Sequence, residues 1–87
     1  MTDELEALRM QVDKVDDQIL KALTERVQIC REIGVVKKKR GVQVRDAARE
    51  NSVFMEVKAK AVKSGLNPLQ VEAVFREIVN MCSAVQE

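Results

Sequence analysis

Apolar residues recur along the first half of the chain at steps of three and four. They are Leu5, Leu8, Val12, Val15, Ile19, Ala22, Ile29, Ile33 and Val36. This spacing is typical of one continuous helix with a single apolar seam, and Gly41 supplies a common stop signal. The pattern predicts a helix over about residues 4–39.

Two shorter helices are expected after it. Asp46 is a good N-cap residue and predicts a helix over about 46–63. Its apolar side carries Ala47, Ala48, Phe54, Met55, Ala61 and Val62. A turn at residues 64–68 combines a glycine stop, an asparagine cap and a proline suited to the first helical position. A third helix follows over about 68–86, with a seam of Val71, Val74, Ile78, Met81 and Val85. The fold class is therefore all-α, with residues 1–87 as a single domain.

The first helix is too long for a compact monomer. At 1.5 Å per residue it measures about 50 Å. A compact chain of 87 residues is only about 30 Å across. Another chain must therefore cover much of the seam, and a homodimer is the simplest arrangement.

Composition and charge narrow the classes of function. The chain has 15 basic and 14 acidic residues and only two aromatic ones, so it lacks the basic excess and stacking platforms of nucleic-acid binders. The basic run 37–40 is in itself typical of a solvated helix end. No apolar run reaches the length of a membrane span, and the acidic start lacks the apolar stretch of a signal peptide. We expect no nucleic-acid partner, no membrane association and a cytoplasmic location.

The cysteines do not predict a metal site. The chain has no histidine, and Cys30 and Cys82 lack the spacing of metal ligands. A Cys₂His₂ site and a histidine base are both excluded. Since both cysteines have apolar neighbours in the sequence, we expect buried free thiols in a reducing compartment.

Arg26 occupies the one gap in the apolar seam. A buried guanidinium without a partner is costly, so the residue is either part of a buried ion pair, a register-setting polar residue, or an anion site. Arg26, Cys30, Ile33 and Lys37 follow at steps of four, three and four and share one face. The two cations, about 16 Å apart along the helix, bracket an apolar stretch. This arrangement suits a small molecule with two carboxylates and an apolar ring.

Other polar residues are able to converge on that site. Arg9 lies about 25 Å from Arg26 and on another face of the helix. It cannot reach that pocket from the same helix, but the Arg9 of an antiparallel partner chain could. On the third helix, Gln86 shares a face with Val79 and Cys82, although it could also be a frayed terminal residue.

Asp46, Arg49 and Glu50 cluster in the first turn of the second helix. Capping and complementation of the helix dipole would explain them without any ligand. A role at the end of the pocket is the alternative.

In their order and spacing these residues resemble the all-helical class of chorismate mutase. The matching elements are Leu8-Arg9, Val15-Asp16, Glu25-Arg26, Gly34 with Lys37, residues 44–50 and residues 75–86, which together span essentially the whole chain. The resemblance implies an intertwined homodimer, a six-helix bundle of two three-helix chains. Each of its two active sites would receive one arginine from the partner. It also implies rearrangement of chorismate to prephenate, in phenylalanine and tyrosine biosynthesis, without a cofactor.

The resemblance also implies roles at the cationic end of the pocket. Arg26 and the partner's Arg9 would bind the two carboxylates of the substrate. Lys37 and Gln86 would donate hydrogen bonds to the ether oxygen of the breaking bond. Cys82 stands where the family often has a hydroxyl residue near a carboxylate, and a thiol is only a weak donor.

At the ring end, Glu50 and the backbone around Asp46 would hold the hydroxyl group, supported by Arg49. Ile33 and Val79 would line the pocket. The rearrangement is pericyclic, so fixing the substrate and stabilising the charge on its ether oxygen replace acid–base chemistry.

Two other functions fit part of the pattern. An isochorismate-pyruvate lyase shares the fold and the cationic end, but the Arg49-Glu50 pair matches the mutase pattern. A non-catalytic helical dimerisation module is the other alternative. Arg26 inside the seam argues against that module.

Overall fold

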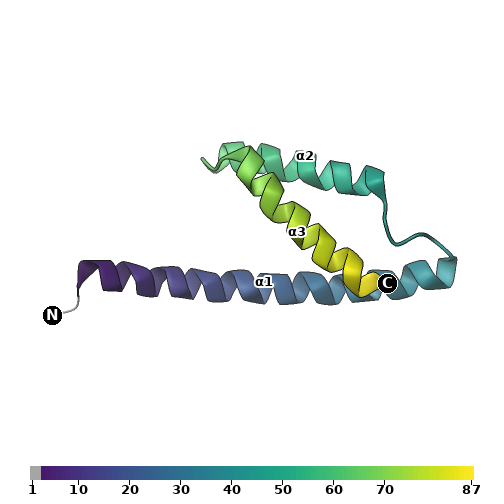
Figure 1. The fold of residues 1–87 in the computed structure, drawn as a ribbon, viewed down its shortest axis with the longest axis horizontal. Coiled ribbons are helices and arrows are strands. Elements are labelled where there is room, and N and C mark those ends of the chain that lie inside the picture. The colour runs from purple at the N-terminus through teal and green to yellow at the C-terminus, as the bar shows by residue number, and fades with distance from the viewer. Residues whose placement is uncertain (1–2) are drawn as a thin grey trace.

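Three helices form the computed structural model, which describes residues 3–87 (Figure 1). Their bounds are α1 Glu4–Arg40, α2 Ala47–Lys63 and α3 Pro68–Gln86. Each bound lies within one residue of the predicted one, and no strand occurs within 3–87. The predicted all-α class with three helices is confirmed. The first two residues, which the predicted domain 1–87 includes, lie outside the described part.

Local signals set the ends of α1. The Asp3 side chain accepts a hydrogen bond from the backbone N–H of Leu5 at 3.3 Å, which satisfies one of the free donors of the first turn. At the other end Gly41 has φ +66°, in the left-handed region that glycine adopts without steric cost. The helix therefore ends where the sequence places its glycine.

The shorter helices also begin at side-chain caps. Asp46 precedes α2 and accepts from the backbone N–H of Arg49 at 3.0 Å. Asn67 precedes α3 and accepts from two backbone amides of its first turn, at 2.9 and 3.2 Å, and Pro68 is the first helical residue. These caps keep the connections short, so α2 and α3 form a hairpin.

The third helix holds the fold together. α3 packs against both α1 and α2, whereas within the described residues no Cα atom of α1 lies within 8 Å of one of α2. Figure 1 shows that α3 begins at the turn after α2 and runs down onto the C-terminal half of α1. The buried apolar residues are Cys30, Phe54, Ala61, Val79 and Cys82. This core is small, as expected for a short chain.

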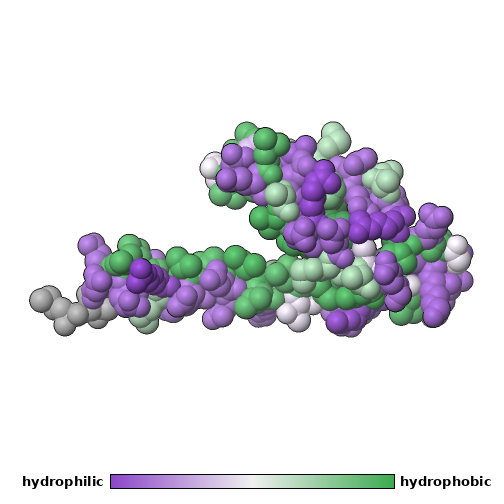
Figure 2. Space-filling model, viewed as in Figure 1, coloured by the Kyte–Doolittle hydropathy of each residue, from purple (hydrophilic) through white to green (hydrophobic). Residues whose placement is uncertain are grey.

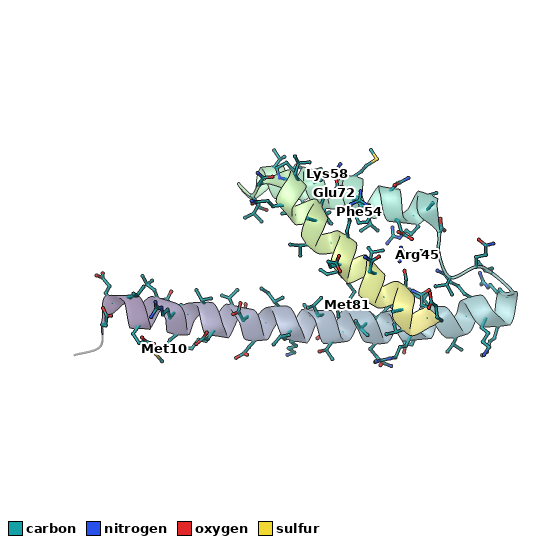
Figure 3. All side chains as sticks on the ribbon, in the orientation of Figure 1. Met10, Arg45, Phe54, Lys58, Glu72 and Met81 are labelled. Atoms are coloured by element: carbon teal, nitrogen blue, oxygen red, sulfur yellow. The ribbon has the colours of Figure 1, made fainter. Side chains whose placement is uncertain are left out.

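Side chains of opposite charge join α2 to α3. The ammonium group of Lys58 lies 2.8 Å from a carboxylate oxygen of Glu72, and Arg76 binds the other oxygen at 2.8 Å (Figure 3). The guanidinium of Arg76 also lies over the Phe54 ring, 4.4 Å from its centroid. Phe54 thus anchors the hairpin beneath a small charged network.

The N-terminal half of α1 extends away from the rest of the chain. The molecule measures 60 × 25 × 15 Å, and its radius of gyration is 16.6 Å against about 12 Å for a compact chain of this length. The seam residues of this half remain 51–57% exposed: Leu5, Leu8, Val12, Val15 and Ile19. Figure 2 shows a green, hydrophobic stripe along this N-terminal half of α1.

The predicted apolar faces of α2 and α3 are only partly buried within the single chain. Met55 and Val62 of α2 are exposed, and so are Val74 and Met81 of α3. The side of α3 that packs against α1 instead carries Val79, Cys82 and Ser83, all buried. The reason is that α3 lies between two helices, so its contacts do not follow a single seam.

Candidate active site

One cavity of about 430 Å³ lies between the C-terminal half of α1, the connection 41–46, the start of α2 and the end of α3. Its size is typical of sites for small molecules. Nine of the ten predicted site residues line it: Arg26, Ile33, Lys37, Asp46, Arg49, Glu50, Val79, Cys82 and Gln86. The tenth, Arg9, does not.

Arg26 enters the cavity from α1 without a carboxylate partner. Its Nη1 lies 2.7 Å from Cys82 Sγ and 4.0 Å from Cys30 Sγ. Within residues 3–87, no Asp or Glu oxygen comes within ion-pair distance of this half-buried guanidinium. Thiols are weak hydrogen-bond acceptors. The buried ion pair considered from the sequence is therefore not formed among the described residues 3–87, and Arg26 keeps its capacity to bind an anion.

Lys37 connects three segments at the other end of the cavity. Its Nζ donates to the backbone oxygen of Val44 in the connection and to Oε1 of Gln86 in α3, the latter at 3.0 Å. An ammonium group has three donors, so one remains for a ligand. The side chain is half-buried and held at both contacts.

The contact with Lys37 also orients the amide of Gln86. Because an ammonium group only donates, the amide oxygen must face Lys37. The amide NH₂ then remains as a donor in a residue that lines the cavity. Lys37 and Gln86 thus offer two hydrogen-bond donors in the same part of the site.

Asp46 and Glu50 each use one carboxylate oxygen to accept a hydrogen bond from within the chain. Asp46 caps α2 through the backbone N–H of Arg49, as the capping interpretation predicts. Glu50 Oε1 accepts from Arg45 Nη1 at 3.0 Å, and Arg45 Nη2 donates to Asn80 of α3 at 2.9 Å (Figure 3). Arg45 therefore ties the carboxylate of Glu50 to α3. Glu50 still has a second oxygen that can accept a hydrogen bond.

The two thiols lie side by side at the Arg26 end. Cys30 and Cys82 are free and buried, as predicted. Burial raises the pKa of Cys30 from 9.0 to about 11, its hydrogen bond with Cys82 adds to this shift, and the charges of Arg26 and Lys37 oppose it. Cys30 is therefore a neutral thiol at physiological pH.

Sequence reasoning missed several residues of the site. Val44 supplies a carbonyl to Lys37, and Ser83 places a buried hydroxyl in the cavity wall. Ser83 lies four residues after Val79 and three before Gln86, so its spacing on the helix was a usable signal. Arg45 was missed as well, although it precedes Asp46 directly.

Arg9 lies outside the cavity, on the free half of α1. Its side chain is exposed, and its only ion-pair contact within residues 3–87 is with Glu6, at 3.8 Å. The helical rise places it about 25 Å from Arg26. Arg9 is therefore remote from the cavity of its own chain.

Within residues 3–87 there is no group of three or more Cys, Asp or Glu side chains placed to hold a metal ion. In the same part of the chain, no helix is both long enough and apolar enough to cross a membrane.

Comparison with known proteins points to one family. A sequence profile of the family described as chorismate mutase type II matches residues 8–87. A bifunctional chorismate mutase/prephenate dehydratase of Aquifex aeolicus is 30% identical over 88 residues, covering 98% of this chain and 24% of the relative. A chorismate mutase of Methanocaldococcus jannaschii is 21% identical over 87 residues, covering 100% of this chain and 88% of the relative.

The fold has a counterpart among solved structures. A conserved hypothetical protein from Pyrococcus furiosus has a TM-score of 0.78 and 29% identity, with complete coverage of both chains. The chain spans only about a quarter of the length of the Aquifex aeolicus relative.

Proposed function

This chain belongs to the chorismate mutase type II family, and from that premise we propose that it rearranges chorismate to prephenate. The observation that carries the proposal is a cavity that holds Lys37 and Gln86 and also Arg26, which has no carboxylate partner among residues 3–87. Chorismate has two carboxylates and an ether oxygen on a small ring. A cavity with separated cationic groups and apolar walls is complementary to such a molecule.

Arg26 binds one carboxylate of the substrate. Its present contacts with Cys82 and Cys30 are weak, so a carboxylate replaces them with charge-assisted hydrogen bonds. Cys82 remains beside this carboxylate as a weak donor. Ile33 and Val79 form apolar walls of the same cavity.

Lys37 and Gln86 act on the ether oxygen. Two of the three Lys37 donors are held by Val44 and Gln86, which fixes the ammonium group and leaves one donor free. The Gln86 amide contributes its NH₂ from the opposite helix. Both donors are in place before the reaction and become most effective as negative charge develops on the oxygen in the transition state.

Glu50 accepts a hydrogen bond from the ring hydroxyl. Its contact with Arg45 holds the carboxylate in place, and the first turn of α2 adds backbone groups around Asp46. Arg49 lines the same end of the cavity and supports the bound ring. The cavity thus offers a group for the hydroxyl as well as groups for a carboxylate and for the ether oxygen.

A homodimer completes the site. The free half of α1 exposes an apolar stripe that no described part of the same chain covers, and it carries Arg9. An antiparallel partner that packs along this stripe brings its own Arg9 toward the cavity and supplies a cation for the second carboxylate. Two chains in this arrangement make a six-helix bundle with two equivalent sites.

The reaction needs no proton transfer. The ether C–O bond breaks as a new C–C bond forms between the side chain and the ring, and every atom of chorismate remains in prephenate. The protein therefore acts by holding the side chain over the ring and by stabilising charge on the oxygen, without a cofactor. In a cell, prephenate formed in this way would enter the synthesis of phenylalanine and tyrosine.

The decisive experiment follows the ultraviolet absorbance of chorismate with purified protein and identifies the product. Prephenate formation supports the proposal. A parallel assay with isochorismate tests the lyase alternative, for which salicylate would appear. Turnover of neither compound, together with failure to bind a bicyclic dicarboxylate that mimics the transition state, would leave a non-catalytic dimerisation module.

A further inference from the structure

Gly34 marks a very close approach between α1 and α3. A Cβ atom placed on Gly34 would lie 3.0 Å from the Cα of Gln86, and 3.2 Å from both its Cβ and its Cγ. Gly34 is also one of only two buried residues of α1 within the described chain. The other two glycines have positive φ and open space around them, so their roles lie in the turns.

A side chain at position 34 cannot be accommodated by a simple rotation. The three nearest atoms all belong to Gln86, and one of them is backbone. Non-bonded carbon atoms prefer separations of about 3.5–4.0 Å, so even a methyl group requires Gln86 to move away by a few tenths of an ångström. Because one of the atoms to be moved is the Cα of Gln86, rotation of its side chain alone does not relieve the contact.

Such a movement disturbs the contact that orients the Gln86 amide. Lys37 lies three residues after Gly34, on the same side of α1, and its Nζ is 3.0 Å from Gln86 Oε1. A shift of the Gln86 backbone by a few tenths of an ångström lengthens or tilts this hydrogen bond and so weakens it. The direction of the amide NH₂ is then less well fixed.

We propose that Gly34 is a positioning residue for the reaction. Its missing side chain lets the end of α3 lie on α1 at the distance at which Lys37 orients Gln86. The proposal rests on the proposed function, in which these two side chains act together on the ether oxygen. It also explains why a helix-weakening residue stands in the interior of α1, where alanine would favour the helix more strongly.

The test begins with Gly34→Ala and Gly34→Val, with Gln28→Ala on the exposed surface of α1 as the control. For Gly34→Ala we expect wild-type helix content, a kcat about 10- to 100-fold lower, and a KM within about threefold of wild type. Valine should lower kcat further, and the control should not. A wild-type kcat in Gly34→Ala would overturn the proposal.

A double-mutant cycle separates positioning from packing. If Gly34 acts through Gln86, then Gly34→Ala lowers kcat in the wild-type background but adds little to Gln86→Ala, which already lacks the amide. An equal factor in both backgrounds would mean that Gly34 acts through the packing of α3 alone. That result would contradict the proposal.

Amide hydrogen exchange tests the contact without any substrate. The last turn of α3 should exchange faster in Gly34→Ala than in wild type, whereas Gln28→Ala should leave its rate unchanged. Unchanged exchange in Gly34→Ala would overturn the close approach itself. An inactive wild-type protein refutes the proposed function, whereas an active Gly34→Ala variant beside an active wild type refutes only the role of Gly34.

Discussion

The two halves of α1 have the same helical geometry but differ in their surroundings, although Ile29 and Val36 of the C-terminal half are also exposed. In the C-terminal half, α3 covers Cys30 and Gly34, and neighbouring side chains line the cavity. In the N-terminal half, residues such as Leu8 and Val15 stay about half exposed. One chain therefore builds most of a polar site while leaving much of its apolar surface uncovered.

This difference suggests that function is divided between two chains. In the proposed dimer, the covered half of α1 serves the site of its own chain, and the uncovered half serves the site of the partner. Substitutions in the two halves of α1 should then impair different sites of the dimer. A change in the covered half affects the site in which it lies, and a change in the uncovered half affects the other site.

The largest effect is expected in the covered half, at Lys37. Replacing it by alanine removes one donor to the ether oxygen and releases Gln86 and the Val44 carbonyl. The loss of one such preorganised donor lowers kcat by about 10²–10³. Steady-state assays with chorismate measure this loss, and circular dichroism checks that the variant remains helical.

Lys38→Ala is the matched control for Lys37. Lys38 is exposed, follows directly in the sequence and does not line the cavity. It should keep wild-type kcat and KM. Near-wild-type turnover in Lys37→Ala would rule out its role at the ether oxygen.

The next effect is expected in the uncovered half, at Arg9. Arg9→Ala should lower kcat/KM by about 10- to 100-fold, because a charge-assisted hydrogen bond to a carboxylate is lost. Lys14→Ala, a change of another exposed cation of the same half, should have little effect. The expected loss is large for a residue so far from the cavity of its own chain.

Mixed dimers sharpen the comparison between the halves. Arg9→Ala and Lys37→Ala chains, each expected to have a tenth of wild-type kcat/KM or less alone, form hybrids in which one of the two sites has both side chains. Unfolding and refolding an equal mixture should restore about a quarter of wild-type activity, since half of the dimers are hybrids. Absence of any recovery would contradict the contribution of Arg9 across the dimer.

The helices could be predicted because their signals are local. The steps of three and four define α1, and Asp46, Asn67 and Gly41 mark helix ends within a few residues. The face of α1 that receives α3 could not be predicted in this way. It is centred on Cys30 and Gly34, small residues with little apolar signal, whereas the larger apolar residues remain for another chain.

The site was predictable where a charge interrupts an apolar pattern. Arg26 stands out for this reason and Lys37 through its spacing from Arg26 on the same face, and both line the cavity. Arg45 did not stand out, because its partner Asn80 lies 35 residues away on another helix. Contacts of this kind depend on how helices cross, which periodicity within one helix does not reveal.

A change of pH dependence is expected when Gln86 becomes glutamate. The wild-type amide does not titrate, so kcat should stay flat between about pH 6 and 8. In Gln86→Glu only the protonated acid donates to the ether oxygen. With a usual glutamate pKa of about 4.3, kcat should rise up to about tenfold for each pH unit of acidification. A flat profile in Gln86→Glu, measured beside wild type in the same buffers, would exclude a donor role.

The smallest effect concerns stability, and it belongs to the covered half. Burial raises the pKa of Cys30 from 9.0 to about 11. Between these values the unfolded chain has lost this proton and the folded chain still holds it, so the free energy of unfolding falls as pH rises. By pH 10 the loss from this group is about 1 kcal/mol per chain.

Urea unfolding at pH 8 and pH 10 under reducing conditions measures this loss of stability. Circular dichroism follows the unfolding, since the chain has no Trp or Tyr. Cys30→Ala should lose less stability over this interval. An equal loss in both proteins would show that the alkaline sensitivity comes from other groups and not from the thiol beneath α3.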